Sequence, residues 1–215
     1  MKTLIAIPCL NMVHTEFMTS FLSLEKVGQT RTSVTYSTMT YDARNNIAAA
    51  AIENGFDRIM WFDSDMTFDS DIMRKLTEDM DRKNLDFVSA LYFKRSIPTR
   101  PVIFKSLIYD RQPEQVVIKA EHYDDYPRNE LFEIEGSGFG GVLMTVSSLK
   151  KVAEAFGLPF SPMMGFGEDL SFCWRMKQLG IKMYCDSRVK MGHLASIAVE
   201  EKHYLSQPER MPENA

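Results

Sequence analysis

The sequence predicts a single α/β domain with a mostly parallel central sheet, flanking helices and a smaller antiparallel portion. In residues 1–93, short apolar strand-like segments alternate with helical segments, which is typical of a parallel sheet. After Lys94, strand-like segments follow one another with few helices between them. The 215 residues, 45% of them hydrophobic and 25% charged, suffice for one domain with a substantial core. We expect this domain over residues 1–194, with halves meeting near residue 93, and a polar tail over residues 195–215.

The first half is expected to alternate strands with helices. Asp42 is a good N-cap for the second helix and Gly55 a good C-cap, while Pro8 is expected to stop the first strand. The expected strands are residues 3–7, 31–36, 56–62 and 86–91, and the expected helices are residues 14–25, 43–54 and 70–83.

The second half is expected to be richer in strands. Ser147 or Ser148 is expected to cap one helix, and Gly180 to end the other. The glycine-rich run 136–141 is not a phosphate loop, because no Gly-Lys-Ser/Thr follows it. A bend for close approach of a ligand or backbone and a simple glycine turn both remain open. The expected strands are 102–105, 115–119, 131–135, 142–146 and 181–185, the helices are 147–156 and 168–179, and 188–193 is extended.

Composition excludes several classes of protein. The formal charge of −4 gives no overall basic surface for nucleic acid or anionic membrane, although a local patch stays open. Cys9, Cys173 and Cys185 are odd in number and lack Cys-x-x-Cys spacing, so neither a disulfide framework nor a zinc site is expected. No apolar run has signal-peptide character or membrane-spanning length. We therefore expect a cytoplasmic protein with reduced thiols and no membrane segment.

Asp63-Ser64-Asp65 follows the expected strand at 56–62 and is the first candidate site. Ligands of open α/β sheets bind beyond the carboxyl ends of the strands. Two carboxylates at such a place suit Mg²⁺ or Mn²⁺, which prefer oxygen ligands and leave positions open for phosphates. Turn and helix-cap chemistry is the structural alternative for the same residues.

Two further groups of charged residues have both a functional and a structural interpretation. Glu168 and Asp169 begin an expected helix, where the helix dipole alone favours acids. Lys94, Arg95 and Arg100 follow the expected strand at 86–91, so they either meet phosphates or form a solvated loop.

Together, the ordered motifs resemble a nucleotide-sugar glycosyltransferase of the GT-A (Rossmann-like) type, nearest to the broad glycosyltransferase family 2 pattern. The resemblance covers the chain up to His193, and each motif is short while the ordered set is fairly specific. The matching segments are Ile7-Pro8 with Asn11, Ala43-Arg44-Asn45, Trp61-Phe62-Asp63-Ser64-Asp65, residues 138–144, residues 167–175 and His193.

The resemblance implies a metal-dependent site for a nucleoside-diphosphate sugar. It implies Asp65 as a direct ligand of Mn²⁺ or Mg²⁺, Asp63 at the ribose or at the metal through water, and His193 as a distal metal ligand. A lone histidine is otherwise usually structural. The resemblance makes residues 1–93 the nucleotide-binding half and 94–194 the acceptor-side half.

Donor-binding roles follow from the same resemblance. Pro8 and Asn11 would line the nucleobase pocket, Arg44 would lie near the base or phosphates, and Gly140 and Gly141 would lie beneath the donor sugar. The resembling enzymes most often use UDP, so a UDP-linked donor is expected. The acidic residue usual after the second strand is not evident in residues 35–41, which leaves base recognition open.

The resemblance also implies inverting transfer to an acceptor hydroxyl. Asp169 matches the general base, and Glu168 would bind sugar or acceptor hydroxyls, or the two roles are exchanged. Trp174 is either a stacking platform for sugar or a core residue of its helix, and the amphipathic pattern favours the core. The acceptor stays open between a polysaccharide, a lipid carrier, a protein and a modified DNA base, and the oligomeric state is not predicted.

Two other functions remain as alternatives. Asp63, Asp65, Glu168 and Asp169 would also suit a two-metal phosphoesterase or nuclease. A non-catalytic sugar- or nucleotide-binding module on the same fold is the other alternative, because fold does not imply function.

Overall fold

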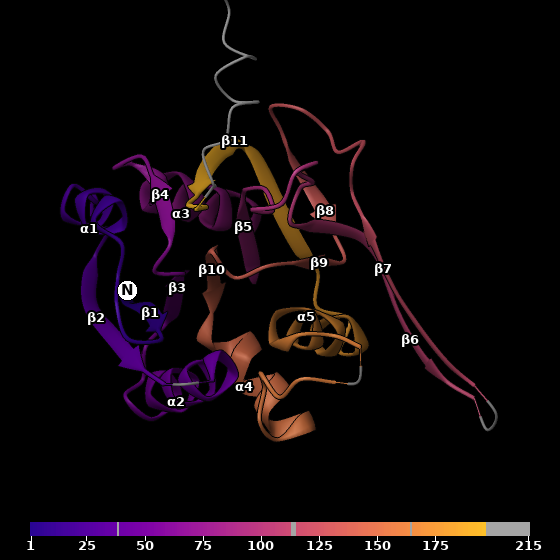
Figure 1. The fold of residues 1–215 in the computed structure, drawn as a ribbon. Coiled ribbons are helices and arrows are strands. Elements are labelled where there is room, and N and C mark those ends of the chain that lie inside the picture. The colour runs from indigo at the N-terminus through magenta and orange to yellow at the C-terminus, as the bar shows by residue number, and fades with distance from the viewer. Residues whose placement is uncertain (38, 113–114, 164, 197–215) are drawn as a thin grey trace, which may run out of the picture.

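The computed structural model describes residues 1–37, 39–112, 115–163 and 165–196. An eight-stranded sheet forms the centre of the domain, and a three-stranded sheet lies beside it (Figure 1). The strands of the large sheet are β1 (Lys2–Cys9), β2 (Gln29–Tyr36), β3 (Arg58–Phe62), β4 (Met66–Phe68), β5 (Phe87–Leu91), β8 (Leu131–Ile134), β10 (Gly141–Thr145) and β11 (Met183–His193). The small sheet contains β6 (Ile103–Arg111), β7 (Val116–His122) and β9 (Gly136–Ser137).

The predicted fold class is confirmed. The large sheet has the order β2-β1-β3-β10-β5-β11-β4, with β8 paired to β11. β2, β1 and β3 are parallel to one another, and β5 is parallel to β11. β10 lies antiparallel between β3 and β5. The order β7-β6-β9 of the small sheet is antiparallel throughout.

Helices cover both faces of the large sheet because its central strands are apolar on both sides. In β1, Leu4 and Ala6 enter one core while Ile5 and Ile7 enter the other. The first core is covered by α2 (Thr40–Glu53), α4 (Val146–Phe156) and α5 (Glu168–Gln178), and the second by α1 (Thr15–Leu22) and α3 (Ile72–Lys83) (Figure 1).

Three predictions about element ends are wrong. Pro8 does not stop β1, which stays paired with β2 as far as Cys9. On its other side, β1 is paired with β3 only as far as Ala6. Pro8, which has no N–H, therefore lies where one side of the strand has no partner strand. Asp42 does not cap α2, which begins two residues earlier. Thr145, rather than Ser147 or Ser148, caps α4, because its side chain accepts a hydrogen bond from the Ser148 N–H.

The C-terminal strand differs most from expectation. The segments expected at 181–185 and 188–193 form one strand, β11, with a register shift between Asp186 and Lys190. Beyond that shift β11 pairs antiparallel with β4, a three-residue strand that the sequence did not predict, and His193 lies opposite Met66. This pairing carries His193 to the turn after β3, where the Leu194 N–H donates to the Asp65 carbonyl at 2.9 Å.

The β6–β7 hairpin is longer than expected and projects from the domain (Figure 1). Within the described ranges, none of the helices combines the length and apolar character that crossing a membrane requires. Cys9, Cys173 and Cys185 are free thiols. Most of the expected tail at 195–215 lies outside the described residues.

Candidate functional site

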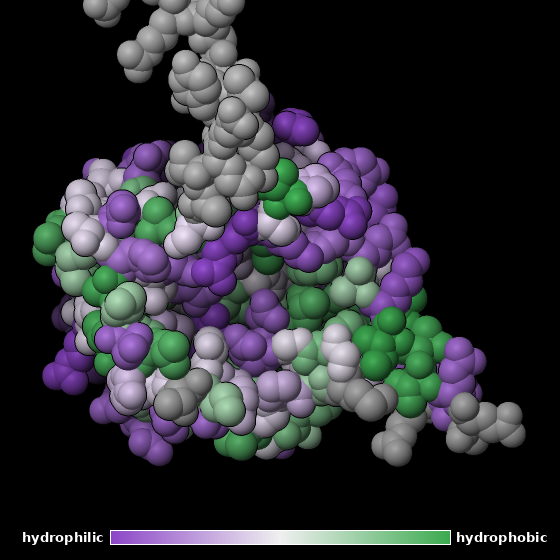
Figure 2. Space-filling model, in the orientation of Figure 1, coloured by the Kyte–Doolittle hydropathy of each residue, from purple (hydrophilic) through white to green (hydrophobic). Residues whose placement is uncertain are grey.

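A cavity of about 790 Å³ opens at the carboxyl ends of β1, β3 and β5. It is bordered by the loop after β1, the turn after β3, the loop after β5 and the start of α5. Figure 2 shows a hollow on this face with hydrophilic residues in it. The sequence-predicted residues that line the cavity are Pro8, Asn11, Arg44, Asp63, Asp65, Glu168, Asp169 and His193.

Asp65 and His193 form one corner of the cavity. The Nε2 atom of His193 lies 3.5 Å from Oδ2 of Asp65, and its Nδ1 lies 3.0 Å from the Phe93 carbonyl oxygen. Because a carbonyl only accepts hydrogen bonds, Nδ1 carries a proton, and Nε2 donates to Asp65 when the ring is protonated. Burial opposes that protonated state, but the hydrogen bond to Asp65 outweighs it and raises the pKa of His193. Burial opposes ionisation of Asp65, but the hydrogen bond with His193 and the charges of His193 and Arg95 outweigh it and lower the pKa of Asp65.

This corner fits a divalent cation. It offers a carboxylate oxygen and an imidazole nitrogen oriented by a backbone carbonyl, the arrangement seen around metal-binding histidines. The described part of the chain contains no group of three or more His, Cys, Asp or Glu side chains suited to a metal. An ion held here would therefore take its other ligands from water or from a bound phosphate, which suits Mn²⁺ or Mg²⁺.

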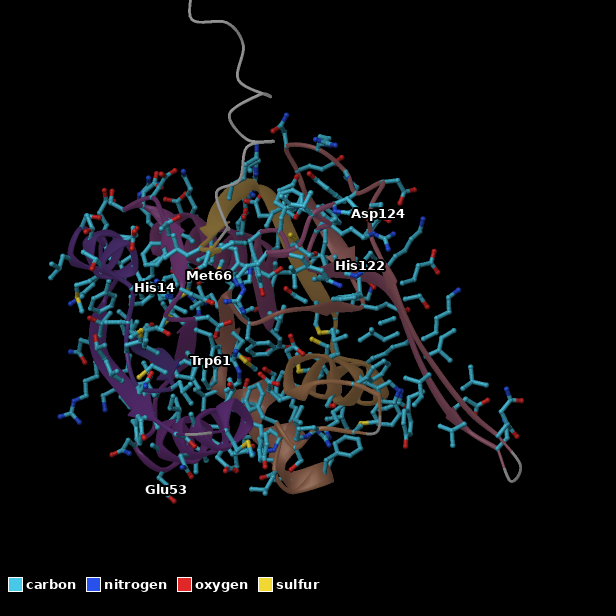
Figure 3. All side chains as sticks on the ribbon, in the orientation of Figure 1. His14, Glu53, Trp61, Met66, His122 and Asp124 are labelled. Carbon is cyan, nitrogen blue, oxygen red and sulfur yellow. The ribbon has the colours of Figure 1, made fainter. Side chains whose placement is uncertain are left out.

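Arg44, on α2, lies between the two acidic pairs. Its side chain is 2% exposed, and its Nη2 donates to Oδ1 of Asp63 at 2.7 Å while its Nε donates to Oε1 of Glu168 at 3.4 Å. The guanidinium lies 5.6 Å from the Trp61 ring centre and 5.3 Å from that of Phe139. Figure 3 shows Trp61 in the interior of the molecule. These contacts hold Arg44 in place and orient Asp63.

Glu168 and Asp169 form the opposite corner, at the first turn of α5. Burial first, and the neighbouring negative charge of Glu168 second, raise the pKa of Asp169 to about 6. The Leu170 N–H, which donates to Oδ1 at 2.7 Å, and the charge of Arg44 oppose this rise. A carboxyl with this pKa changes its protonation near neutral pH, as a general base must. Glu168, in contrast, forms an ion pair with Arg44.

The two predicted glycines are packed against protein side chains and do not line the cavity. A Cβ at Gly140 would come within 3.0 Å of the Met66 and Tyr92 side chains, so these would have to shift slightly. A Cβ at Gly141 would collide with Sδ of Met191. The Gly140 N–H donates to the Tyr92 hydroxyl at 3.2 Å. Close approach of these side chains accounts for the glycine-rich run, and a place beneath a donor sugar stays a prediction.

Tyr92 is the main residue of the cavity that the sequence interpretation missed. It follows β5 directly, is buried, lines the cavity and contacts the His193 ring with 5.5 Å between ring centres. Burial raises the pKa of Tyr92 well above its ordinary value, so the hydroxyl keeps its proton. Its place at the carboxyl end of a central strand was the available signal. Trp174 is half-buried against Tyr109 and Phe156, which supports the core interpretation.

Comparisons with known proteins identify the fold. Neither a protein-family model nor a curated protein sequence matches this chain. The crystal structure of A197 from STIV aligns with a TM-score of 0.62 and 18% identity, over 91% of this chain and 87% of that chain. The structure of GalNAc-T7 with UDP, GalNAc and Mn²⁺ aligns with a TM-score of 0.60 and 10% identity, over 92% of this chain and 43% of that chain. This chain thus spans less than half of the second protein, and the fold resembles the GT-A type.

Proposed function

We propose that this chain is a metal-dependent inverting glycosyltransferase that moves a sugar from a nucleoside-diphosphate sugar to an acceptor hydroxyl. The observation that carries the proposal is the division of one cavity into two corners. Asp65 and His193 offer metal ligands on one side, and Asp169 offers a carboxyl with a pKa of about 6 on the other. A sugar between the corners would have its diphosphate near Asp65 and its acceptor near Asp169.

The donor would lie along the loop after β1 and the turn after β3. Pro8 and Asn11 would contact the nucleobase, and Asp63, oriented by Arg44, would accept hydrogen bonds from the ribose. Asp65 and His193 would hold Mn²⁺ or Mg²⁺. When bound, the ion would offset the negative charge that develops on the departing nucleoside diphosphate. UDP and Mn²⁺ in the GalNAc-T7 structure support a UDP-linked donor and manganese.

The chemical step would be a single displacement. Asp169 would take the proton of the acceptor hydroxyl as its oxygen forms a bond to the anomeric carbon. The bond from that carbon to the diphosphate oxygen breaks at the same time, and its electron pair leaves with the nucleoside diphosphate. Attack opposite the leaving group inverts the anomeric configuration. Glu168, fixed by Arg44, would orient hydroxyl groups of the sugar or acceptor.

The position of Arg44 favours this function over a two-metal phosphoesterase. A two-metal site needs ions about 4 Å apart that share carboxylate ligands. Here a buried guanidinium is bonded to Asp63 and to Glu168, so a positive charge lies where the acidic pairs would have to share a metal. The raised pKa of Asp169 favours catalysis over a binding module, because sites that only bind do not need a base titrating near pH 6. We place the activity in the cytoplasm, which the free thiols support.

A panel of nucleotide sugars tests this function directly. Slow hydrolysis, with water as acceptor, would be measured as free nucleoside diphosphate in the presence of Mn²⁺ and in the presence of chelator. We expect turnover of one donor only with metal, and its loss in Asp65→Ala. Folded protein that turns over none of the donors with Mn²⁺ would contradict the proposal.

A further inference from the structure

The loop after β5, residues 94–100, carries three cations that the structure separates into two groups. Lys94 and Arg95 line the cavity. Arg100 does not line the cavity and instead forms an ion pair with Asp124, which follows β7 at the base of the β6–β7 hairpin (Figure 3). From the sequence alone, all three cations could either contact phosphates or belong to a solvated loop.

Arg95 contacts the same oxygen that faces His193. Its Nη1 donates to Oδ2 of Asp65 at 2.9 Å, and Nε2 of His193 lies 3.5 Å from that atom. The guanidinium therefore stands beside the oxygen that would coordinate a metal. The Arg95 side chain is 56% exposed, and exposed ion pairs of this kind are weak and readily exchanged.

The backbone beneath Arg95 is held, so its side chain can change partner without movement of the loop. The Lys94 N–H donates to the Arg100 carbonyl at 2.9 Å, and the Thr99 hydroxyl donates to the Lys94 carbonyl at 2.7 Å. Among the residues that the structure describes, the Lys94 ammonium forms no ion pair. One cation at the cavity is thus unpaired and the next is weakly paired.

We infer that Lys94 and Arg95 form a diphosphate-binding subsite, which Asp65 masks in the free protein. The inference rests on the proposed function and deepens it. With a metal ion and a diphosphate bound, Asp65 would hold the ion, and Arg95 would exchange the carboxylate for phosphate oxygens. The fork of a guanidinium matches phosphate geometry in two parallel hydrogen bonds, and Lys94 adds a point charge beside it.

This exchange predicts effects of opposite sign for one substitution. Without Arg95, the metal no longer competes with a guanidinium for Asp65, so binding of metal alone becomes tighter. The diphosphate loses a charged partner, so its binding becomes weaker. A residue that only stabilises the loop would not strengthen one ligand while weakening the other.

The experiment compares Arg95→Gln with Arg100→Gln, which changes a cation of the same loop that is paired with Asp124 and does not line the cavity. The dissociation constant of Mn²⁺ alone is measured by electron paramagnetic resonance, and that of inorganic pyrophosphate with Mg²⁺ by calorimetry. We expect Arg95→Gln to tighten Mn²⁺ binding about two- to fivefold. We expect it to weaken pyrophosphate binding about tenfold. Lys94→Gln should weaken pyrophosphate only, and Arg100→Gln should change neither constant more than about twofold.

The outcomes distinguish this inference from the proposed function. The inference alone would be overturned by a particular pattern of Mn²⁺ binding. In that pattern, the wild type binds Mn²⁺ strongly, Asp65→Asn binds it more weakly, and Arg95→Gln binds it no more tightly than the wild type. Pyrophosphate binding that is equal in wild type and Arg95→Gln would do the same. A wild type that binds no Mn²⁺, or binds it as well in Asp65→Asn, would overturn the proposed function and the inference together.

Discussion

The two acidic pairs of the cavity look alike in sequence and differ in chemistry. Asp65 lies beside His193 and Arg95, and its pKa is lowered. Asp169 is half-buried beside Glu168, and its pKa is raised to about 6. One carboxyl is therefore kept anionic, as a metal ligand should be, and the other is kept ready to accept a proton. Environments that push the pKa values of two carboxyls apart assign their roles.

Arg44 keeps the two corners distinct. It holds one member of each pair, Asp63 and Glu168, and leaves Asp65 and Asp169 to face the cavity without that restraint. The comparison teaches that the members of each pair are not equivalent. In each pair, one residue is fixed by a buried cation and the other is available for ligand or proton.

The largest effect is expected for a substitution of Asp169, the proposed base. Asp169→Asn removes the proton acceptor and keeps the shape, so we expect the transfer rate to fall about 10³-fold. Donor binding should change little, because Asp169 is remote from the metal corner in this account. Rates and donor dissociation constants measured on the same preparation check both statements. Normal transfer by Asp169→Asn would show that the base is elsewhere, with Glu168→Gln as the matched variant.

The next effect concerns the residue between the corners. Arg44→Met leaves Asp63 and Glu168 without their buried partner, so we expect the free energy of unfolding to fall by about 3 kcal/mol. Urea unfolding measures this change. Lys182→Met is the control, because Lys182 and Glu133 form an exposed pair whose loss should leave the urea midpoint nearly unchanged. Equal effects of the two substitutions would contradict the central role of Arg44.

The third prediction concerns Asp65 and His193, the proposed metal ligands. Asp65→Ala removes the carboxylate ligand, so Mn²⁺ affinity should fall at least about tenfold, with metal-dependent donor binding lost. His193→Ala should weaken Mn²⁺ in the same direction. Titration of Mn²⁺ into each variant gives the answer, and unchanged affinity in both would place the metal elsewhere.

The smallest expected effect is a shift in the pH dependence of the transfer rate, which depends on the pKa of Asp169. Asp169 acts only when deprotonated, so the transfer rate should rise with pH, about tenfold per unit below pH 6, and level off above pH 7. Glu168→Gln removes a negative neighbour that raises the pKa of Asp169, so the rising limb should move to lower pH. Rate–pH profiles of both proteins measure the shift. A profile that is flat between pH 5 and 7 would contradict the assignment.

Local patterns predicted the strands and helices, because alternation, apolar runs and turn residues act over short distances. By themselves they did not predict that His193 reaches Asp65, which only the family resemblance implied. This contact depends on the register shift in β11 and on β4, whose three residues are too few to show a period. The contact between Arg44 and Glu168 joins residues 124 positions apart and could not be inferred from local patterns either. The glycine-rich run was noticed, but its fit to Tyr92 and the methionines becomes visible only in three dimensions.

The most direct measurement is the position of manganese in crystals grown with UDP and Mn²⁺, located by anomalous scattering. We predict one ion bonded to Asp65 Oδ2, to His193 Nε2 and to the diphosphate, with Arg95 in contact with phosphate and Asp169 free of metal. An ion bridging Glu168 and Asp169, or none near Asp65, would contradict this prediction.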